Sequence, residues 1–426
     1  MQSNKGAEAF TLISHELSEL SKAQTQRSIY RVHKYLRNVN SQCYEPDTVA
    51  IGPYHSGKDN LKMMEEHKLR YLQLLLGRKK ENVERYISAM GELEQEARNC
   101  YADPIHLNSA KFIKMLVLDG CFIIELVRKR HKRDPTCKND PIFKMGWIMN
   151  SLQRDIILFE NQIPFFVLRR LFDLIEGPNQ YDKLIHRLLF FCHNLYPGGR
   201  LKYKTERSPE EIMHVLDLVH GNWIPSVKEV NVNVNVDETD RTREWRFIHS
   251  ATELTNANVA FQKRKSDDFF KVEFDDGLMQ MPPLTIEDRT ECFFRNLIAY
   301  EQYFQGTRPN FVTDYVKLLD CLIDSSKDVD ILCECEIIDN WLGDNEVVAD
   351  IFNRLTLSIT GPDQHFVYTD VFDKVNAHYG KRRNKAMATL RRDYFNSPWA
   401  YFSFFAALAI LLLTVAQTVF SALQVF

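Results

Sequence analysis

The 426-residue sequence lacks the motifs that usually indicate nucleotide or hydrolase chemistry. It contains no Gly-x-Gly-x-x-Gly, no phosphate-binding loop, no Gly-x-Ser-x-Gly and no His-Glu-x-x-His motif. It also has no Asn-x-Ser/Thr acceptor for N-glycosylation, and its nine cysteines are too scattered for a disulfide scaffold. These absences favour a protein that is not an enzyme and whose cysteines are reduced, cytosolic thiols.

An excess of positive charge is also absent. The chain has 54 Lys and Arg against 57 Asp and Glu, a net charge of −3, so it offers no general basic surface to nucleic acid. Basic and aromatic residues do not interleave in any one segment, as a platform for single strands requires. With 45% hydrophobic and 26% charged residues, the chain has the composition of a globular protein of one large or two medium domains. We expect no nucleic-acid partner.

Charge is missing altogether from residues 394–426. The 22 residues from Trp399 to Phe420 are mostly apolar, and at about 1.5 Å per residue a helix of this length covers roughly 33 Å, enough for a hydrocarbon core of about 30 Å. A buried core helix is the alternative, but a soluble helix of this length normally keeps a polar stripe. We predict one transmembrane helix over 399–420, followed by a short tail, 421–426.

A basic juxtamembrane segment, 381–398, precedes the predicted span. Its only acidic residue is Asp393, and its cations are Lys381, Arg382, Arg383, Lys385, Arg391 and Arg392. By the positive-inside rule they place the N-terminal body in the cytosol, and near an anionic leaflet each cation adds about 1 kcal/mol of attraction. A solvated helix face is the alternative. Because the N-terminus does not resemble a secretory signal, we expect a C-terminal anchor in the plasma membrane or an endomembrane.

Hydrophobic periodicity predicts a mainly α-helical body over residues 25–380, after a loose segment, 1–24. Helices are expected at 60–78, 110–130, 151–175, 290–305, 310–324, 346–357 and 370–395. The 110–130 helix is apolar nearly all round and should be buried, and Pro164 should kink or break the 151–175 helix.

Three kinds of non-helical segment are expected within this body. Residues 28–36 and 44–51 look extended, and Asp-Gly at 276–277 suits the turn of a small hairpin over 270–281. The segments 197–209 and 225–243 are polar and irregular, and we interpret them as variable surface loops.

Four carboxylates lie in apolar surroundings, where an unpaired charge is costly: Asp119, Glu125, Asp155 and Glu160. We expect them to be structural, paired with nearby cations and with backbone amides freed near Pro164. The candidate cations are Lys111, Lys114 and Arg154. The alternative is a membrane-tethered enzyme that uses these carboxylates for general acid and base catalysis.

Asn161 and Gln162 precede Pro164, and their amide side chains can bond the backbone groups that the proline leaves open. His55 closes the turn Gly52-Pro53-Tyr54-His55. A histidine alone in a tight turn is more often structural than a catalytic base or a metal ligand, so we expect a structural role.

The closest cysteine pair, Cys333 and Cys335, lacks two further metal ligands at suitable spacing, with only distant Cys321 or His365 available. We therefore expect no metal and no cofactor.

Several motifs together resemble the plant family of domain of unknown function 247. They are SIYRV (28–32), YEPDTVAIGPYH (44–55), MEEHKLRY (64–71), MLVLDGCFIIE (115–125), DIILFENQIPFFVL (155–168), SATEL (250–254), FRNLIAYEQ (294–302) and SPW (397–399). The sequence departs from the family pattern at His33, where proline is usual, and at Ser56, where a second histidine is common. Both departures weaken a catalytic role for this region.

The resemblance implies a plant protein with a mostly helical body, one C-terminal transmembrane helix and no established enzymatic activity. Family members are linked genetically to self-incompatibility in grasses, which suggests a role in recognition or signalling. The implied partners are membrane lipid and unidentified proteins, including related members in homo- or hetero-oligomers, with the loops 197–209 and 225–243 tuning partner choice. The family-motif residues expected to be structural are Gly52, Pro53, Tyr54, His55, Asp119, Glu125, Glu160, Asn161, Gln162 and Pro164.

Overall fold

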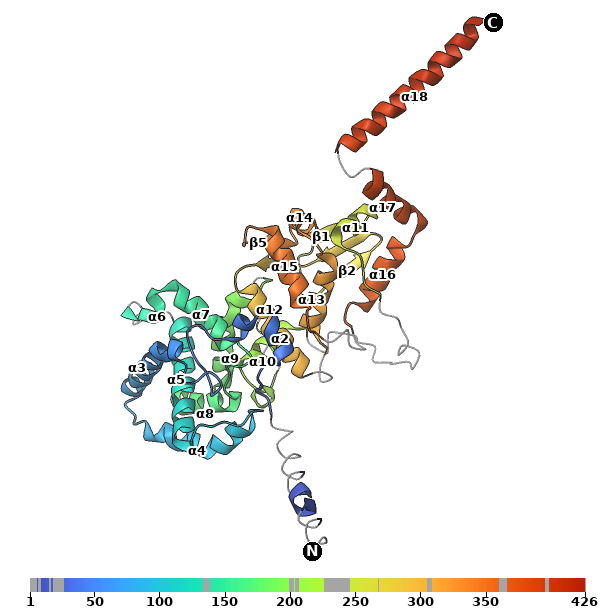
Figure 1. The fold of residues 1–426 in the computed structure, drawn as a ribbon. Helices are drawn as coiled ribbons and strands as arrows, with labels where there is room; N and C mark the ends of the chain where they lie inside the picture. Colours follow the sequence, from blue (N-terminus) through green and yellow to red (C-terminus); the bar gives the residue numbers. More distant parts are fainter. Residues whose placement is uncertain are drawn as a thin grey trace.

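The computed structural model describes residues 6, 9–14, 17, 27–132, 137, 139–198, 203, 207–225, 246–266, 268–304, 309–359, 366–394 and 398–425. These residues form an elongated, mainly helical body from which one long C-terminal helix projects (Figure 1). The predicted fold class is therefore confirmed. Most of the segment 1–24, residues 226–243 of one predicted loop and several residues of the loop 197–209 lie outside the described residues.

The N-terminal half is built around α5 (Ser109–Lys132), against which α3 (Lys62–Lys79), α4 (Glu84–Asn99) and two later helices pack. Residues 115–129 of α5 are buried almost without interruption, as its apolar sequence predicts. Gly120 allows the close approach of α8 (Phe165–Glu176), because a Cβ at this position would lie 2.3 Å from Leu171 Cδ1.

The predicted break at Pro164 is confirmed. After the short α6 (Pro141–Lys144), α7 (Gly146–Ile156) ends eight residues before the proline, and α8 (Phe165–Glu176) starts directly after it. Pro164 suits this position because a residue preceding a helix needs no amide hydrogen. α9 (Tyr181–Cys192) then returns along α5.

The C-terminal half contains further packed helices and two small sheets. Its helices are α10 (Val215–Trp223), α11 (Ala251–Asn256), α12 (Thr290–Tyr303), α13 (Phe311–Leu322), α14 (Ser326–Glu334) and α15 (Asn345–Leu355). The predicted hairpin is confirmed: β2 (Glu273–Asp275) pairs antiparallel with β3 (Leu278–Met281), and Asp276 and Gly277 supply the positive φ angles of its turn.

The sequence patterns did not predict two parallel pairings. β1 (Ala260–Lys263) pairs with β3, and β4 (Leu284–Ile286) pairs with β5 (Ile338–Asn340). The partners of the second pair lie more than fifty residues apart, so no local turn signal could identify them.

The tail consists of α16 (Thr369–Tyr379), α17 (Arg382–Tyr394) and α18 (Pro398–Val425). The prediction of one helix over 370–395 is wrong, because α16 ends near Gly380 and α17 then packs against α11. The Asn384 amide donates to the carbonyl oxygen of His378 at this corner.

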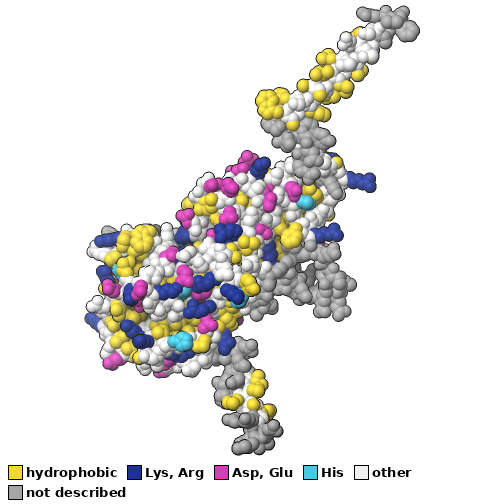
Figure 2. Space-filling view, viewed as in Figure 1, with side chains coloured by type: hydrophobic (Ala, Val, Ile, Leu, Met, Phe, Trp, Pro, Cys, Tyr) yellow, Lys and Arg dark blue, Asp and Glu magenta, His cyan; other side chains and the backbone are white. Residues whose placement is uncertain are grey.

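α18 contains a 20-residue apolar stretch, Phe402–Ser421, that is long enough to cross a membrane. None of this stretch is buried against the body, and Figure 2 shows hydrophobic side chains along the projecting helix. The predicted span therefore exists as a candidate membrane helix.

The segments predicted as extended form no strand. Ile29 makes only an isolated parallel bridge with Tyr101, and α2 (Lys34–Val39) interrupts the first segment. The 3-10 helix η1 (Ser41–Tyr44) begins the second segment, and residues 45–58 follow as irregular backbone up to η2 (Asp59–Leu61). We call residues 45–58 the first loop.

Candidate functional site

The first loop has buried backbone amides that no strand partner satisfies, and the carboxylate of Asp155 accepts three of them. Its two oxygens take N–H groups from Asp47 at 3.1 Å, Thr48 at 2.7 Å and Val49 at 2.9 Å. Arg154 adds an ion pair at 3.0 Å, as the sequence predicts. Burial raises the pKa of Asp155 to about 6 despite these donors. At the start of the loop, the Asp155 carboxylate thus accepts the backbone hydrogen bonds that a neighbouring strand would accept in a sheet.

Asn161 and Gln162 join this loop to the end of α7. Asn161 accepts the Ile51 N–H at 2.6 Å and donates to the carbonyl oxygens of Val49 and Asp155. Gln162 donates to the carbonyl oxygens of Ile156, the last residue of α7, and of Leu158, just after the helix. Both amides therefore bond backbone groups, but these belong to the first loop and to the end of α7, whereas the sequence predicted the groups that Pro164 leaves open.

Asp119 on α5 holds the next part of the loop. It accepts the Gly52 N–H at 2.8 Å and forms a buried ion pair with Lys68 at 2.6 Å. Lys68 also donates to the Ala50 carbonyl oxygen and to Glu65. Burial alone would lower the pKa of the Lys68 ammonium group. The negative charges of Asp119 and Glu65 together have the larger effect, so the pKa is raised. Lys68, rather than the exposed Lys111 or Lys114, is the partner of Asp119.

Gly52 has a conformation and a position that no other residue fits. Its φ is +76°, and a Cβ would lie 2.2 Å from the carbonyl oxygen of Gln162. The neighbouring Tyr54 hydroxyl donates to the Ile29 carbonyl oxygen at 3.2 Å. The turn that contains Gly52 and Tyr54 is therefore held against two other parts of the backbone, at Gln162 and at Ile29.

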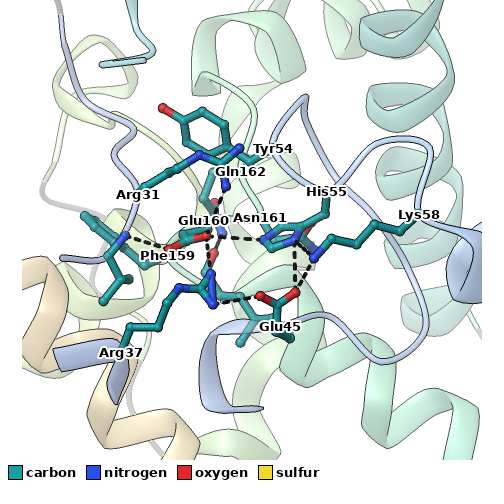
Figure 3. Close-up of polar contacts among 12 residues, drawn as sticks. Arg31, Arg37, Glu45, Tyr54, His55, Lys58, Phe159, Glu160, Asn161 and Gln162 are labelled. Atoms are coloured by element: carbon teal, nitrogen blue, oxygen red, sulfur yellow. Dashed lines mark hydrogen bonds and ion pairs between the residues drawn. The ribbon is translucent and has the colours of Figure 1, made fainter. Parts of the chain in front are cut away.

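Glu160 has a fully buried side chain, and its polar contacts are drawn in Figure 3. It accepts the Val32 N–H at 2.6 Å and pairs with Arg37 at 2.7 Å. Arg31 lies 3.8 Å away, and His55 Nε2 lies 3.6 Å away. Glu160 therefore ties the N-terminal segment to the break between α7 and α8.

His55 lies between the Glu160 and Glu45 carboxylates, with Nδ1 2.8 Å from Lys58 Nζ. Burial, with a further contribution from the Lys58 charge, lowers the pKa of His55 to about 3, so the imidazole is neutral at physiological pH. Its side chain is only 1% exposed. A general base must reach a substrate proton, and this histidine is enclosed by the protein.

Glu125 is likewise paired. Arg78 and Arg128 both donate to its carboxylate, the latter at 3.0 Å. The structure thus brings Asp119, Asp155, Glu160, Asn161 and Gln162 together beneath the first loop, whereas Glu125 lies two turns further along α5 with a separate set of cations.

A second polar centre links α10, α12 and α13, and the sequence analysis missed it. Asp217 accepts from Arg207 and, at 2.7 Å, from the Tyr300 hydroxyl. Glu301 accepts the N–H groups of Val312 and Thr313 at the start of α13 and lies 2.8 Å from His220. Both carboxylates stand in apolar segments, the same signal that identified Asp119.

His214, like His220, belongs to this second centre. His214 precedes α10, and its Nδ1 accepts the Asp217 N–H at 3.2 Å. Burial lowers the pKa of His214 to about 4, while the Arg207 charge outweighs burial and holds the pKa of Asp217 below its ordinary value.

One expectation about cysteine is wrong. Cys43 and Cys292 form a disulfide, with Cα atoms 4.6 Å apart, so these two cysteines are not free thiols. The sequence could not show this, because 249 residues separate the pair. Among the residues that the structure describes, no group of three His, Cys, Asp or Glu side chains could hold a metal ion, and His365 lies outside them.

The basic segment is divided between two environments. Lys381, Arg382 and Arg383 are exposed, whereas Arg391 turns toward the body and donates to the Thr255 carbonyl oxygen at 2.9 Å. The side chains of Lys385 and Arg392 lie outside the described residues. Only part of this segment therefore presents its charge to the surroundings.

These observations define a helical body, organised around an anchored loop, that carries one helix of membrane-spanning length. The family model DUF247, a plant protein of unknown function, matches residues 29–413. A UPF0481 protein of Arabidopsis thaliana is 30% identical over 92% of this chain and 85% of its own length. A second UPF0481 protein of that plant is 25% identical over 94% of this chain and 91% of its own. The chain belongs to the DUF247 family, and no solved structure matches it.

Proposed function

We propose that this protein is a membrane-anchored, non-enzymatic recognition or signalling component whose helical body binds other proteins. The observation that carries the proposal is α18, whose 20-residue apolar stretch has no contact that buries it within the described chain. Membrane lipid is the partner that removes such a surface from water.

The engagement of the buried carboxylates supports a role without catalysis. Asp119, Asp155 and Glu160 each bind loop amides, cations or both, and their oxygens are committed to holding backbone. A catalytic carboxylate has to contact substrate. The alternative of a membrane-tethered enzyme therefore gains no support from these groups.

The exposed cations favour a cytosolic position for the body. Lys381, Arg382 and Arg383 lie within about twenty residues of the span, the distance over which the positive-inside rule operates. On that side they face an anionic leaflet, with about 1 kcal/mol of attraction per cation. The protein is then a C-terminally anchored membrane protein with its body in the cytosol.

The proposed partners are other proteins, including related members of the family in homo- or hetero-oligomers. Recognition residues are often found on loops held by a rigid scaffold. The loops 197–209 and 225–243 are the segments we propose for partner choice. A role in self-recognition, which the resemblance to family members linked to self-incompatibility suggests, is one form of this function.

Loop exchange tests the recognition role. Both loops are replaced by those of the 30% identical relative, and partners are identified by proximity labelling in plant cells. We expect the set of labelled proteins to change while the melting temperature is retained. The matched control exchanges the turn between α3 and α4, residues 80–83, and should leave the set unchanged. An identical set after loop exchange contradicts the proposal.

Protease protection in sealed plant microsomes, with a tag at each end of the chain, tests the orientation. Digestion of the N-terminal tag without detergent supports a cytosolic body, and its protection contradicts it. Extraction with alkaline carbonate separately tests the anchor, because an integral protein remains with the membrane.

A further inference from the structure

The disulfide between Cys43 and Cys292 joins two parts of the chain that are otherwise held by hydrogen bonds. Cys43 lies in η1, just before the first loop, and Cys292 lies in the first turn of α12. Cys43 is completely buried, whereas Cys292 is partly exposed. A reagent from solution therefore reaches Cys292 first.

The two cysteines are held at bonding distance by groups other than their sulfur atoms. The Asn296 amide donates to the carbonyl oxygens of both Cys43 and Cys292, at 2.8 and 2.7 Å. Asn40, next to η1, donates to Glu291 at 3.0 Å. The sulfur–sulfur bond can therefore open and close without separating the segments that carry it.

The other seven cysteines are not part of a disulfide in the structure. Burial raises the pKa of Cys100 to about 11, and of Cys192 and Cys321 to about 12. It also raises the pKa of Cys121, Cys333 and Cys335. A thiol reacts with a disulfide as the thiolate, so burial slows the reaction of these six. What distinguishes Cys43 and Cys292 is geometry, because each has the other cysteine at bonding distance.

We infer that Cys43 and Cys292 form a reversible oxidation site that responds to a small-molecule disulfide. This inference rests on the proposed cytosolic position of the body, because thiols are kept reduced there and the disulfides that do form are usually transient or redox-sensing. The oxidised form fastens η1, and with it the N-terminal segment that supplies Arg37 to Glu160, to α12.

The reaction consists of two thiol–disulfide exchanges. The Cys292 thiolate attacks the small disulfide, whose sulfur–sulfur bond breaks and releases one small thiol. The Cys43 thiolate then attacks the Cys292 sulfur, forms the internal disulfide and releases the second small thiol. Two electrons pass from the cysteine pair to the oxidant, and the two cysteine protons end on the two released thiols.

The test counts free thiols in the full-length protein in detergent across mixtures of glutathione and glutathione disulfide. After acid quenching and alkylation, intact mass should show nine free thiols under reducing conditions and seven under oxidising ones, with peptide mapping assigning the loss to Cys43 and Cys292. Hydrogen exchange of residues 37–44 should be slower in the oxidised form.

The Cys292→Ser variant should lose no thiol pair, whereas the control Cys333→Ser/Cys335→Ser should still lose two.

Three outcomes overturn the inference: nine free thiols under every condition, loss of other cysteines instead, or a bond that persists at a strongly reducing glutathione ratio. The last result identifies a permanent structural disulfide. Because the wild-type count needs no variant, a folding defect in Cys292→Ser does not affect the decision. Failure of the proposed anchor or orientation is measured separately, by carbonate extraction and protease protection.

Discussion

The first loop and the second polar centre both contain buried carboxylates, but these carboxylates bind different kinds of backbone. Asp119 and Asp155 bind amides of the irregular first loop, and Glu160 binds the amide of Val32 in the irregular segment before α2. The three carboxylates pair with Lys68, Arg154 and Arg37. In the second centre, Glu301 binds amides at the start of a regular helix, and its other contacts are a hydroxyl and an imidazole.

This difference shows where a fixed charge is required. An irregular loop leaves several amides unpaired at once, and an anion with two oxygens can serve several of them. Such an anion needs a cation nearby when it is buried. A helix start already has a positive end, which stabilises a carboxylate without a paired cation. Asp119, Asp155 and Glu160 should therefore be more sensitive than Glu301 to the loss of a single charge. Asp217 in the second centre resembles the first group, because it is buried and paired with Arg207.

The largest expected effect is at Asp119. The Asp119→Ala variant leaves the Lys68 ammonium group buried, and among the described residues it then has the half-exposed Glu65 as its carboxylate partner. Removing one partner of a buried ion pair typically costs about 3 to 5 kcal/mol. Urea unfolding of the detergent-solubilised chain measures the loss. The control Glu65→Gln should cost less than about 1 kcal/mol, and equal losses in the two variants would contradict the role of Asp119.

A second prediction uses the pH dependence of the second centre. The pKa of His214 is about 4 in the folded chain, below its ordinary value of 6.5, so its stabilising contribution is complete above pH 6.5 and is lost as the pH falls toward 4. The shift corresponds to about 3 kcal/mol. Asp155, beneath the first loop, has a raised pKa of about 6, so its contribution to stability changes with pH in the opposite direction. That contribution is greatest below pH 4 and is lost as the pH rises through 6.

Thermal unfolding between pH 7 and pH 4 distinguishes the two groups. His214→Asn keeps a side-chain acceptor before α10 and removes the titrating ring, so stability should fall less steeply on acidification. Asp155→Asn removes the opposing contribution, so stability should fall more steeply. Parallel pH profiles for both variants and the parent chain would show that neither group titrates as the structure indicates.

A smaller loss is expected at Glu301. The Glu301→Gln variant weakens hydrogen bonds to Val312, Thr313 and His220 but strands no fixed positive charge. Charge-assisted hydrogen bonds contribute about 1.5 to 3 kcal/mol, so the loss in free energy of unfolding should be about 2 kcal/mol. A loss larger than that of Asp119→Ala would reverse the comparison between Glu301 and the carboxylates that are paired with fixed cations.

The smallest effect is expected at the edge of the first loop. Arg31 is half-exposed, pairs with Asp103 at 3.3 Å and stacks over the Tyr54 ring. Pairs of this kind contribute about 0.2 to 1 kcal/mol. Arg31→Ala should therefore change the urea midpoint only slightly, and high salt should reduce the difference further.

Local signals in the sequence were sufficient for several elements. The apolar run of α5, the proline before α8 and the Asp-Gly turn between β2 and β3 each fix structure through neighbouring residues. The division of the tail into α16 and α17 was missed, because it depends on how α17 packs against the distant α11.

The candidate site was predictable as a set of buried groups but not as a set of contacts. Apolar surroundings identified Asp119, Asp155 and Glu160, since a buried carboxylate needs a partner. Their partners lie far away in sequence: 107 residues separate Thr48 from Asp155, and 123 separate Arg37 from Glu160. Sequence spacing cannot reveal which distant segment supplies them, and for the same reason the disulfide was missed.

The packing of α17 on α11 also limits how far the body can move from a membrane that holds α18. Only three residues, 395–397, lie between α17 and α18, and at a maximum of about 3.5 Å per residue such a link can reach no further than roughly 10 Å. A body tethered so closely explores a thin layer above the bilayer rather than the whole volume of the cell. Two proteins confined to such a layer meet at a high effective concentration, so even weak contacts between their bodies would produce association.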